Sequence, residues 1–338
     1  MVSRVSTFGA LQADLFLIRR QNLNFDRLNF QVATGEKFAE LKNYGTQAPR
    51  ILALQSEIDR RDGYVNSLGL AELNLQSYDT TLERLSQILD DVVKASEPLS
   101  TQDPNFASTT DVLSTNLLIE VEANLNLEIG DRFLFAGSRF DVAPVVDLRT
   151  LPIYTTNDLG VANTVETAND IPTYTVDSGG ANTAVSYHTQ GPNTQDPRSY
   201  NQVSLTVADG AVLTYGITAT DPAFQNLIES IVRLRSSAQA GLTEAEREQF
   251  LAEASTAAQT ARDQIRQLQA KNGLNLSRLQ DQRENHKNFI NISKIALDDI
   301  KLVDDATAAA EISALSAQVQ ASFTVISTRR QLSLVNFL

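Results

Sequence analysis

The sequence predicts a mainly α-helical protein in which long, coiled-coil-like helices from both chain ends pack together. A small β-rich domain is inserted in the middle, which makes the chain an α+β multidomain protein. Three observations predict this fold. Apolar residues recur every three or four positions near both ends. Residues 141–220 instead alternate as strands do, and 338 residues correspond to roughly two domains of about 150 residues.

The first long helix is expected over residues 5–32. Gly35 follows it and is a typical helix stop, because glycine accepts the left-handed conformation that ends many helices. Such a helix is about 42 Å long and needs a partner for its apolar side. The apolar stripe, interrupted by Asn22, contains Phe8, Leu11, Leu15, Ile18, Phe25 and Val32.

A second helix is expected before Pro98 and Pro104, since proline ends helices. Its stripe keeps a coiled-coil spacing throughout. The members of this stripe are Leu68, Ala71, Leu75, Tyr78, Leu82, Leu85, Leu89 and Val92.

The β-rich segment contains short strand-like pieces, among them residues 174–176 and 203–207. Asp209-Gly210 lies between two such pieces and predicts a hairpin turn. Residues 141–220 contain no Lys, two Arg and eight acidic residues, a net charge of −6. Nearly half of the chain's net charge of −13 therefore falls in this segment.

Helices resume at Asp221-Pro222, which matches an N-cap followed by proline in the first helical position. The next helix is expected to carry Phe224, Leu227, Ile231 and Leu234. Beyond Gly241, Thr243 and Glu246 form a capping box that opens another helix. Residues 271–273 (KNG) either interrupt that helix or lie within it, since glycine is tolerated inside a helix at a cost of about 1 kcal/mol.

Two further apolar stripes follow, and the last eight residues, 331–338, stay largely apolar to the end. Chain ends usually become polar unless they are held in place. The first of these stripes contains Phe289, Ile292, Ala296, Ile300 and Val303, and the second contains Ile312, Leu315, Val319, Ser322 and Ile326.

We therefore expect three regions. Residues 1–40 and 304–338 form terminal helical rods, 41–140 and 221–303 form a helical coiled-coil domain, and 141–220 form the β-rich outer insert. Two paired rods still leave apolar sides exposed, so other subunits should cover them. The predicted assembly interface consists of Leu11, Leu15, Ile18, Phe25, Val32, Leu315, Val319, Ile326, Leu332, Leu334 and Phe337. An ordinary helical bundle is the alternative.

The composition argues against several classes of function. With 41 acidic and 28 basic residues the net charge is −13, which disfavours nucleic-acid binding. No Cys and only two His leave no ordinary disulfide, thiolate or zinc site. No apolar run approaches the about 18 residues of a membrane span. Charges at Asp14, Arg19, Arg20 and Asp26 also argue against a cleaved signal peptide.

No catalytic, cofactor-binding or metal-binding residue is predicted, and we expect no enzyme activity. The acidic pairs Asp90-Asp91, Asp298-Asp299 and Asp304-Asp305 should diverge, because adjacent helical residues point about 100° apart. His286 is expected on the surface, and His188 stands alone in a loop. A ligand-binding or glycan-acting module within 141–220 remains an open alternative.

Three segments resemble bacterial flagellar hook-associated proteins of the flagellin superfamily. They are residues 33–37 (ATGEK), 133–138 (FLFAGS) and 331–338 (QLSLVNFL). The first is shared with flagellins, whereas the other two are more similar to the hook-filament junction type. The resemblance covers about residues 1–140 and 221–338. A family pattern of two acids soon after the first segment is replaced here by residues 44–49 (YGTQAP), which retain only the Pro.

The resemblance implies a structural adaptor that polymerises at the hook-filament junction through its terminal helices. It also implies export without a cleaved signal peptide and an extracellular place in the flagellum. Implied partners are further copies of the chain, the preceding hook-associated protein, flagellin and a flagellar export chaperone, with no nucleic acid and no membrane. A flagellin, the propagating filament subunit, is the alternative.

Overall fold

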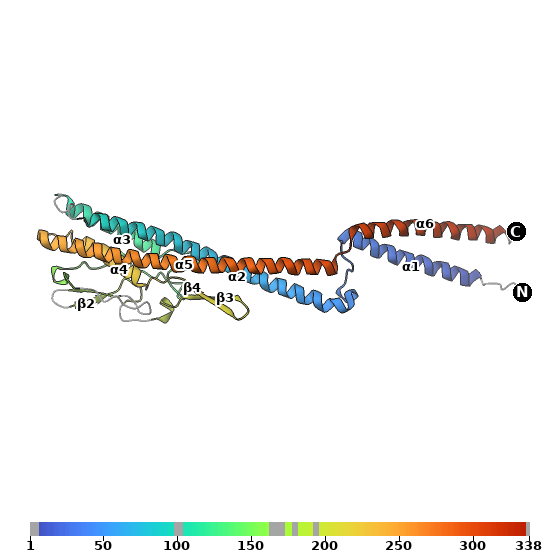
Figure 1. The fold of residues 1–338 in the computed structure, drawn as a ribbon, viewed down its shortest axis with the longest axis horizontal. Helices are drawn as coiled ribbons and strands as arrows, with labels where there is room; N and C mark the ends of the chain where they lie inside the picture. Colours follow the sequence, from blue (N-terminus) through green and yellow to red (C-terminus); the bar gives the residue numbers. More distant parts are fainter. Residues whose placement is uncertain (1–6, 98–103, 162–172, 178–181, 192–195, 336–338) are drawn as a thin grey trace. The chain divides into compact units, whose positions relative to one another are not determined.

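The computed structural model describes residues 7–97, 104–161, 173–177, 182–191 and 196–335, without the side chains at 7, 8, 10, 11, 174, 175, 182 and 329–335. It confirms a mainly α-helical chain with a small β region in the middle (Figure 1). The helices are α1 (Thr7–Thr34), α2 (Ala48–Ala95), α3 (Phe106–Leu125), α4 (Pro222–Ser236), α5 (Glu244–Lys301) and α6 (Asp305–Val335). Short 3-10 helices lie at Leu41–Gln47, Leu148–Thr150, Thr156–Asp158 and Pro197–Ser199.

The chain forms two compact units. The terminal unit contains Met1–Gly63 and His286–Leu338, and the central unit contains Tyr64–Asn285. Helices α2 and α5 contribute residues to both units. The three-part division made from the sequence stays a prediction.

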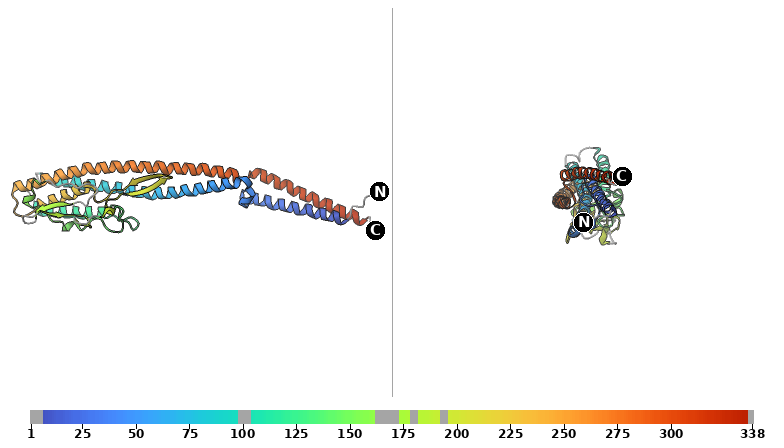
Figure 2. Two further views of the ribbon diagram at one scale, coloured as in Figure 1. Left: turned by 90° about the horizontal axis from the view of Figure 1, so that it is seen from below. Right: turned by 90° about the vertical axis from the view of Figure 1, so that its right-hand side faces the viewer.

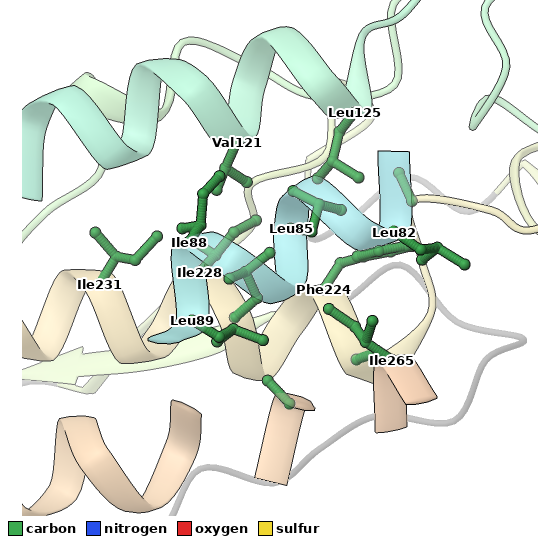
Figure 3. Packing of buried hydrophobic residues seen from close by; sticks show 14 of the residues in the cluster. Leu82, Leu85, Ile88, Leu89, Val121, Leu125, Phe224, Ile228, Ile231 and Ile265 are labelled. Carbon is green, nitrogen blue, oxygen red and sulfur yellow. The ribbon is translucent and has the colours of Figure 1, made fainter. Parts of the chain in front are cut away.

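The core of the central unit is built by α2, α3, α4 and α5. Figure 3 shows Leu85 and Leu89 of α2 facing Val121 of α3 and Phe224 of α4. Every member of the predicted stripe from Leu68 to Val92 is buried, which confirms the coiled-coil spacing. The four apolar residues predicted for α4 are buried as well. Burying one such side chain contributes about 1.5–3 kcal/mol, so the central unit has a substantial core of its own.

The FLFAGS segment, residues 133–138, anchors this core. Phe135 is fully buried, and its ring meets those of Tyr78 and Phe224 edge-on, at centroid distances of 5.1 and 5.5 Å. Tyr78 donates its hydroxyl proton to the Leu134 carbonyl at 2.5 Å. The Phe135 ring thus packs between α2 and α4, which are far apart in the sequence. This contact explains why the FLFAGS segment is apolar although it lies outside the helices.

The described part of the β region contains two antiparallel strand pairs, β1 (Tyr174–Asp177) with β2 (Asn182–Val185) and β3 (Val203–Ala208) with β4 (Ala211–Tyr215). The predicted Asp209-Gly210 turn joins β3 to β4, and Gly210 has a φ of +74°. Buried residues of this region, such as Tyr187 and Tyr215, belong to the same apolar cluster as the helices. The strand pairs therefore share the helical core.

The structure tests two expectations about α5. The capping box is confirmed, because Thr243 and Glu246 exchange hydrogen bonds in both directions. Of the two alternatives at 271–273, the structure shows the uninterrupted one, since α5 runs unbroken from Glu244 to Lys301. Asn272 lies buried inside the helix and donates Nδ2–H to the Leu75 carbonyl of α2 at 2.8 Å. This hydrogen bond to α2 stabilises Asn272, a residue type that is otherwise common in loops, inside the helix.

Gly137 can accept no side chain. Its φ is +63°, and an added Cβ would lie 2.7–2.9 Å from the carbonyl oxygens of Arg198, Ser199 and Asn201. We predict that Gly137→Ala lowers the free energy of unfolding of the central unit by about 2–5 kcal/mol, from backbone strain and overpacking. Gly130→Ala is the control, because Gly130 has a φ of +55° and nothing within 4 Å. It should cost only about 1 kcal/mol, and equal losses in denaturant unfolding would contradict the steric account.

His188 makes the central unit sensitive to acid. It is 2% exposed, and burial, helped by the charge of Arg139, lowers its pKa to about 4. In the unfolded chain this histidine has a pKa of about 6.5. As the pH falls from 6.5 to 4, the unfolded chain therefore binds a proton at His188 that the folded chain does not, and the folded state loses stability. We predict that His188 lowers stability by about 2 kcal/mol between pH 7 and pH 5.

Between pH 7 and pH 5, the free energy of unfolding of the His188→Gln variant should fall by about 2 kcal/mol less than that of the wild type. Urea unfolding at both pH values measures this difference. His286→Gln is the control for removing a buried histidine. Identical pH dependence in the wild type and His188→Gln would show that His188 is not buried in its neutral form.

Candidate assembly interface

Helices α1 and α6 lie side by side in the terminal unit (Figure 2). On α1 the buried positions are Gln21, Leu28 and Gln31, with Ile18 half-buried. Gln21 donates Nε2–H to the hydroxyl of Ser322 on α6 at 2.9 Å. The contact face of α1 is therefore partly polar, although the sequence predicted an almost wholly apolar one.

Large apolar side chains are exposed on the outer sides of both helices. Leu15 is 57% and Phe16 is 70% exposed on α1, and Phe323 and Val325 are exposed on α6. A hollow of about 610 Å³ on α1 is lined by Gln12, Leu15, Phe16, Ile18, Arg19, Asn22, Leu23 and Asp26. Soluble proteins rarely leave large groups of apolar side chains uncovered. This surface is the candidate assembly interface.

The structure separates the predicted interface residues into three groups. Leu15, Phe25 and Val32 are exposed. A second group is half-buried between the paired helices and contains Ile18, Leu315, Val319 and Ile326. Phe337 and the side chains of Leu11, Leu332 and Leu334 lie outside the described residues. Their contact with other subunits stays a prediction.

Sequence reasoning missed Phe16, Leu23, Phe323 and Val325, which lie off the predicted stripes. A signal was present on α1, because residues 15–18 read Leu-Phe-Leu-Ile. Four consecutive apolar residues point around most of a helical turn, so a single partner helix cannot cover them all. Such a run indicates a second neighbour.

A joint formed by residues 35–47 and 302–304 connects α1 and α6 to the rest of the terminal unit. Gly35 ends α1 with a φ of +71°, as predicted for a helix stop. Its carbonyl accepts a hydrogen bond from the Val303 amide at 2.8 Å, and the Lys37 amide donates to the Lys301 carbonyl at 2.7 Å. The two chain connections are therefore hydrogen-bonded to each other. Because α1 ends and α6 begins at this joint, the two helices run antiparallel.

The ATGEK segment holds the joint through its charged side chains. Lys37 donates Nζ–H to the carbonyls of Asp299 and Ile300, each at 2.9 Å. These carbonyls belong to the last turn of α5, where a cation is favoured by the helix dipole. Glu36 forms an ion pair with Lys301 at 2.7 Å. The ATGEK segment thus ends α1 at Gly35 and caps the C-terminus of α5 through Lys37.

The acidic pairs lie apart from any common site. Asp90 pairs with Arg262 at 2.9 Å and Asp91 with Lys94 at 3.2 Å. Asp304 caps α6, since its Oδ1 accepts hydrogen bonds from the amides of Ala306 and Thr307. Within the described ranges, no group of three His, Cys, Asp or Glu side chains is placed to hold a metal ion.

The predictions for α5 beyond residue 285 need two corrections. His286 is 3% exposed, not on the surface, and its Nδ1 accepts a hydrogen bond from Arg61 at 3.1 Å. The buried face of α5 here consists of His286, Ile290 and Ser293. The predicted stripe instead leaves Phe289 and Ile292 exposed. The polar residues His286 and Ser293 occupy the inner face, and His286 has a hydrogen-bond partner there, which an apolar pattern does not reveal.

Comparisons with known proteins agree with this architecture. Residues 243–338 match the family model of the bacterial flagellin C-terminal helical region. A search of curated proteins finds no match. Among the parts that the structure describes, no helix has the length and hydropathy of a membrane span.

Solved structures of flagellar proteins resemble the chain. A flagellar hook-associated protein from Vibrio parahaemolyticus has a TM-score of 0.52 and 14% identity, over 77% of this chain and 100% of that one. Hook-associated protein-3 from Legionella pneumophila has a TM-score of 0.37, 14% identity and coverages of 75% and 97%. FlgL from Xanthomonas campestris has a TM-score of 0.38 and 14% identity, over 74% of this chain and 98% of that one.

Only the first of these likenesses is close enough to establish a shared fold, and it does so without implying a shared activity. The family match covers α5, the joint residues 302–304 and α6, which is one of the two paired terminal helices. The resemblance predicted from the sequence is therefore confirmed: the chain has a flagellin-type C-terminal helical region and the fold of a flagellar hook-associated protein.

Proposed function

We propose that the chain is a structural subunit of the bacterial flagellum, an adaptor at the hook-filament junction that assembles through α1 and α6. The observation that carries this proposal is the exposed apolar surface along both terminal helices, from Leu15 and Phe16 to Phe323 and Val325. The flagellin-type region at 243–338 supports it, because this region includes all of α6. The FLFAGS and QLSLVNFL segments favour the junction type.

The mechanism is packing. Each large apolar side chain that moves from water into a contact between copies contributes about 1.5–3 kcal/mol before ordering costs are subtracted. The six exposed large apolar side chains among the described residues of α1, from Leu15 to Val32, together with Phe323 and Val325 of α6 would supply the free energy for association of many copies, whereas one helix pair alone leaves them in water. No catalytic group is needed, and we propose that the chain is not an enzyme.

The proposed setting is extracellular. The neighbours would be the preceding hook-associated protein on one side and flagellin on the other, and an export chaperone would cover the apolar C-terminal helix beforehand. Export without a cleaved signal peptide suits a chain that contains no Cys, since no disulfide can obstruct passage of an unfolded chain. The net charge of −13 would keep the outer surface soluble.

A flagellin remains the second candidate, because the matching family model is that of flagellin itself. The two functions differ in how far the polymer grows. A flagellin elongates long filaments from seeds without another subunit, while an adaptor forms a short zone and then stops. Electron microscopy of purified protein mixed with isolated hooks distinguishes them, and long unaided filaments would favour flagellin.

We predict that Leu15→Asp and Leu334→Asp each produce cells with hooks but without attached filaments. A carboxylate placed in an apolar contact loses its hydration without gaining a partner, which costs several kcal/mol. Asn24→Asp is the control, since it adds the same charge at another exposed position of α1. Normal filaments in both Leu variants, with expression and export verified, would contradict the proposed assembly surface.

A further inference from the structure

A second apolar surface of the terminal unit lies on α5, away from the paired terminal helices. Ile292 is 64% and Ile295 is 63% exposed, and both lie on α5. Asp298 and Asp299 continue the same side of the helix toward its C-terminus and are exposed. We define these four residues as the α5 stripe. Two aliphatic side chains followed by two carboxylates form a surface with a distinct charge at one end.

The end of α1 and the adjoining part of the joint carry a surface of the opposite charge. A hollow of about 530 Å³ is lined by Arg27, Phe30, Lys37, Phe38, Ala39 and Asn43. Phe30 and Phe38 provide its apolar lining, and Phe38 is held edge-on by Tyr44 at a centroid distance of 5.2 Å. We call this feature the Arg27 hollow. Its size suits a pair of aliphatic side chains.

The charges of the two surfaces are complementary. Arg27 is exposed and forms no ion pair with any residue in the described ranges. The carboxylates of Asp298 and Asp299 likewise have no ion-pair partner among the described side chains. Lys37, the other cation of the hollow, already donates to the carbonyls at the end of α5. Arg27 is therefore the cation that is free to pair with a carboxylate from outside.

We propose that the α5 stripe of one copy docks in the Arg27 hollow of a second copy, with Ile292 and Ile295 against Phe30 and Phe38. This contact rests on the proposed function and adds to it a lateral interface that joins α5 of one copy to the end of α1 and the joint of the next copy. Stripe and hollow are different surfaces of the same chain, so the contact is heterologous. Repetition of a heterologous contact produces a ring or a helical tube, which is the geometry that a junction zone requires.

Cysteine crosslinking tests the contact directly, because the chain contains no Cys and any disulfide must join introduced residues. One preparation carries Ala39→Cys and the other, labelled with ¹⁵N, carries Ile295→Cys. The two are mixed with isolated hooks, allowed to assemble and oxidised mildly. We expect a disulfide-linked dimer with one labelled and one unlabelled chain, present in the sedimented assembly and absent from the free protein.

The control pairs Ala39→Cys with Leu70→Cys, an exposed position of the central unit, and should give no such dimer. Sedimented assembly without the mixed dimer overturns the docking and leaves the proposed function intact. Dimers between two Ala39→Cys chains would overturn the heterologous arrangement. Failure of the unmodified chain to assemble on hooks would overturn the proposed function as well.

Charge reversal provides a second measurement on the full chain. Arg27→Asp alone, or Asp298→Arg with Asp299→Arg, should raise the protein concentration needed for assembly by about tenfold or more. All three changes together in one chain should restore it to within about threefold. Circular dichroism verifies that each variant keeps its helices. Additive loss in the combined variant would show that these charges do not meet between copies.

Discussion

One-sided burial of the terminal helices is the constraint on which the rest of the structure depends. A helix with a single partner can cover only one side, and in the α1–α6 pair that side is partly polar. Gln21 and Gln31 occupy buried positions, and Ser322 accepts a hydrogen bond across the pair. Most of the apolar surface of α1 therefore points away from α6. The pair has modest stability by itself, and contact with other copies provides the remaining burial.

The two units are stabilised in different ways. The central unit has a closed core around Phe135, to which helices and strand pairs both contribute. The terminal unit has few buried apolar residues, and its joint is held mainly by hydrogen bonds and by Lys37 at the end of α5. A fixed joint limits the directions in which α1 and α6 leave it. That limit lowers the entropy lost when many copies align.

Sequence periodicity predicted the fold well where one face of a helix is buried in an apolar core. It identified the whole stripe of α2 from Leu68 to Val92 and the hairpin turn at Gly210. It failed on α5, where His286 and Ser293 are buried and Ile292 is exposed, because hydrogen bonding to Arg61 replaces apolar contact there. The role of Lys37 could not be predicted either, since it depends on carbonyls about 260 residues away in the sequence.

Side-chain footprinting with hydroxyl radicals is the most direct measurement of one-sided burial, because it reports the exposure of individual residues in both states. In the free chain, Leu15, Phe16, Phe323 and Val325 should be strongly oxidised, while buried Phe135 is protected. In assemblies on hooks, those four residues should become protected to the level of Phe135. Protection of the four residues in the free chain, or their full oxidation within the assembly, would contradict the account.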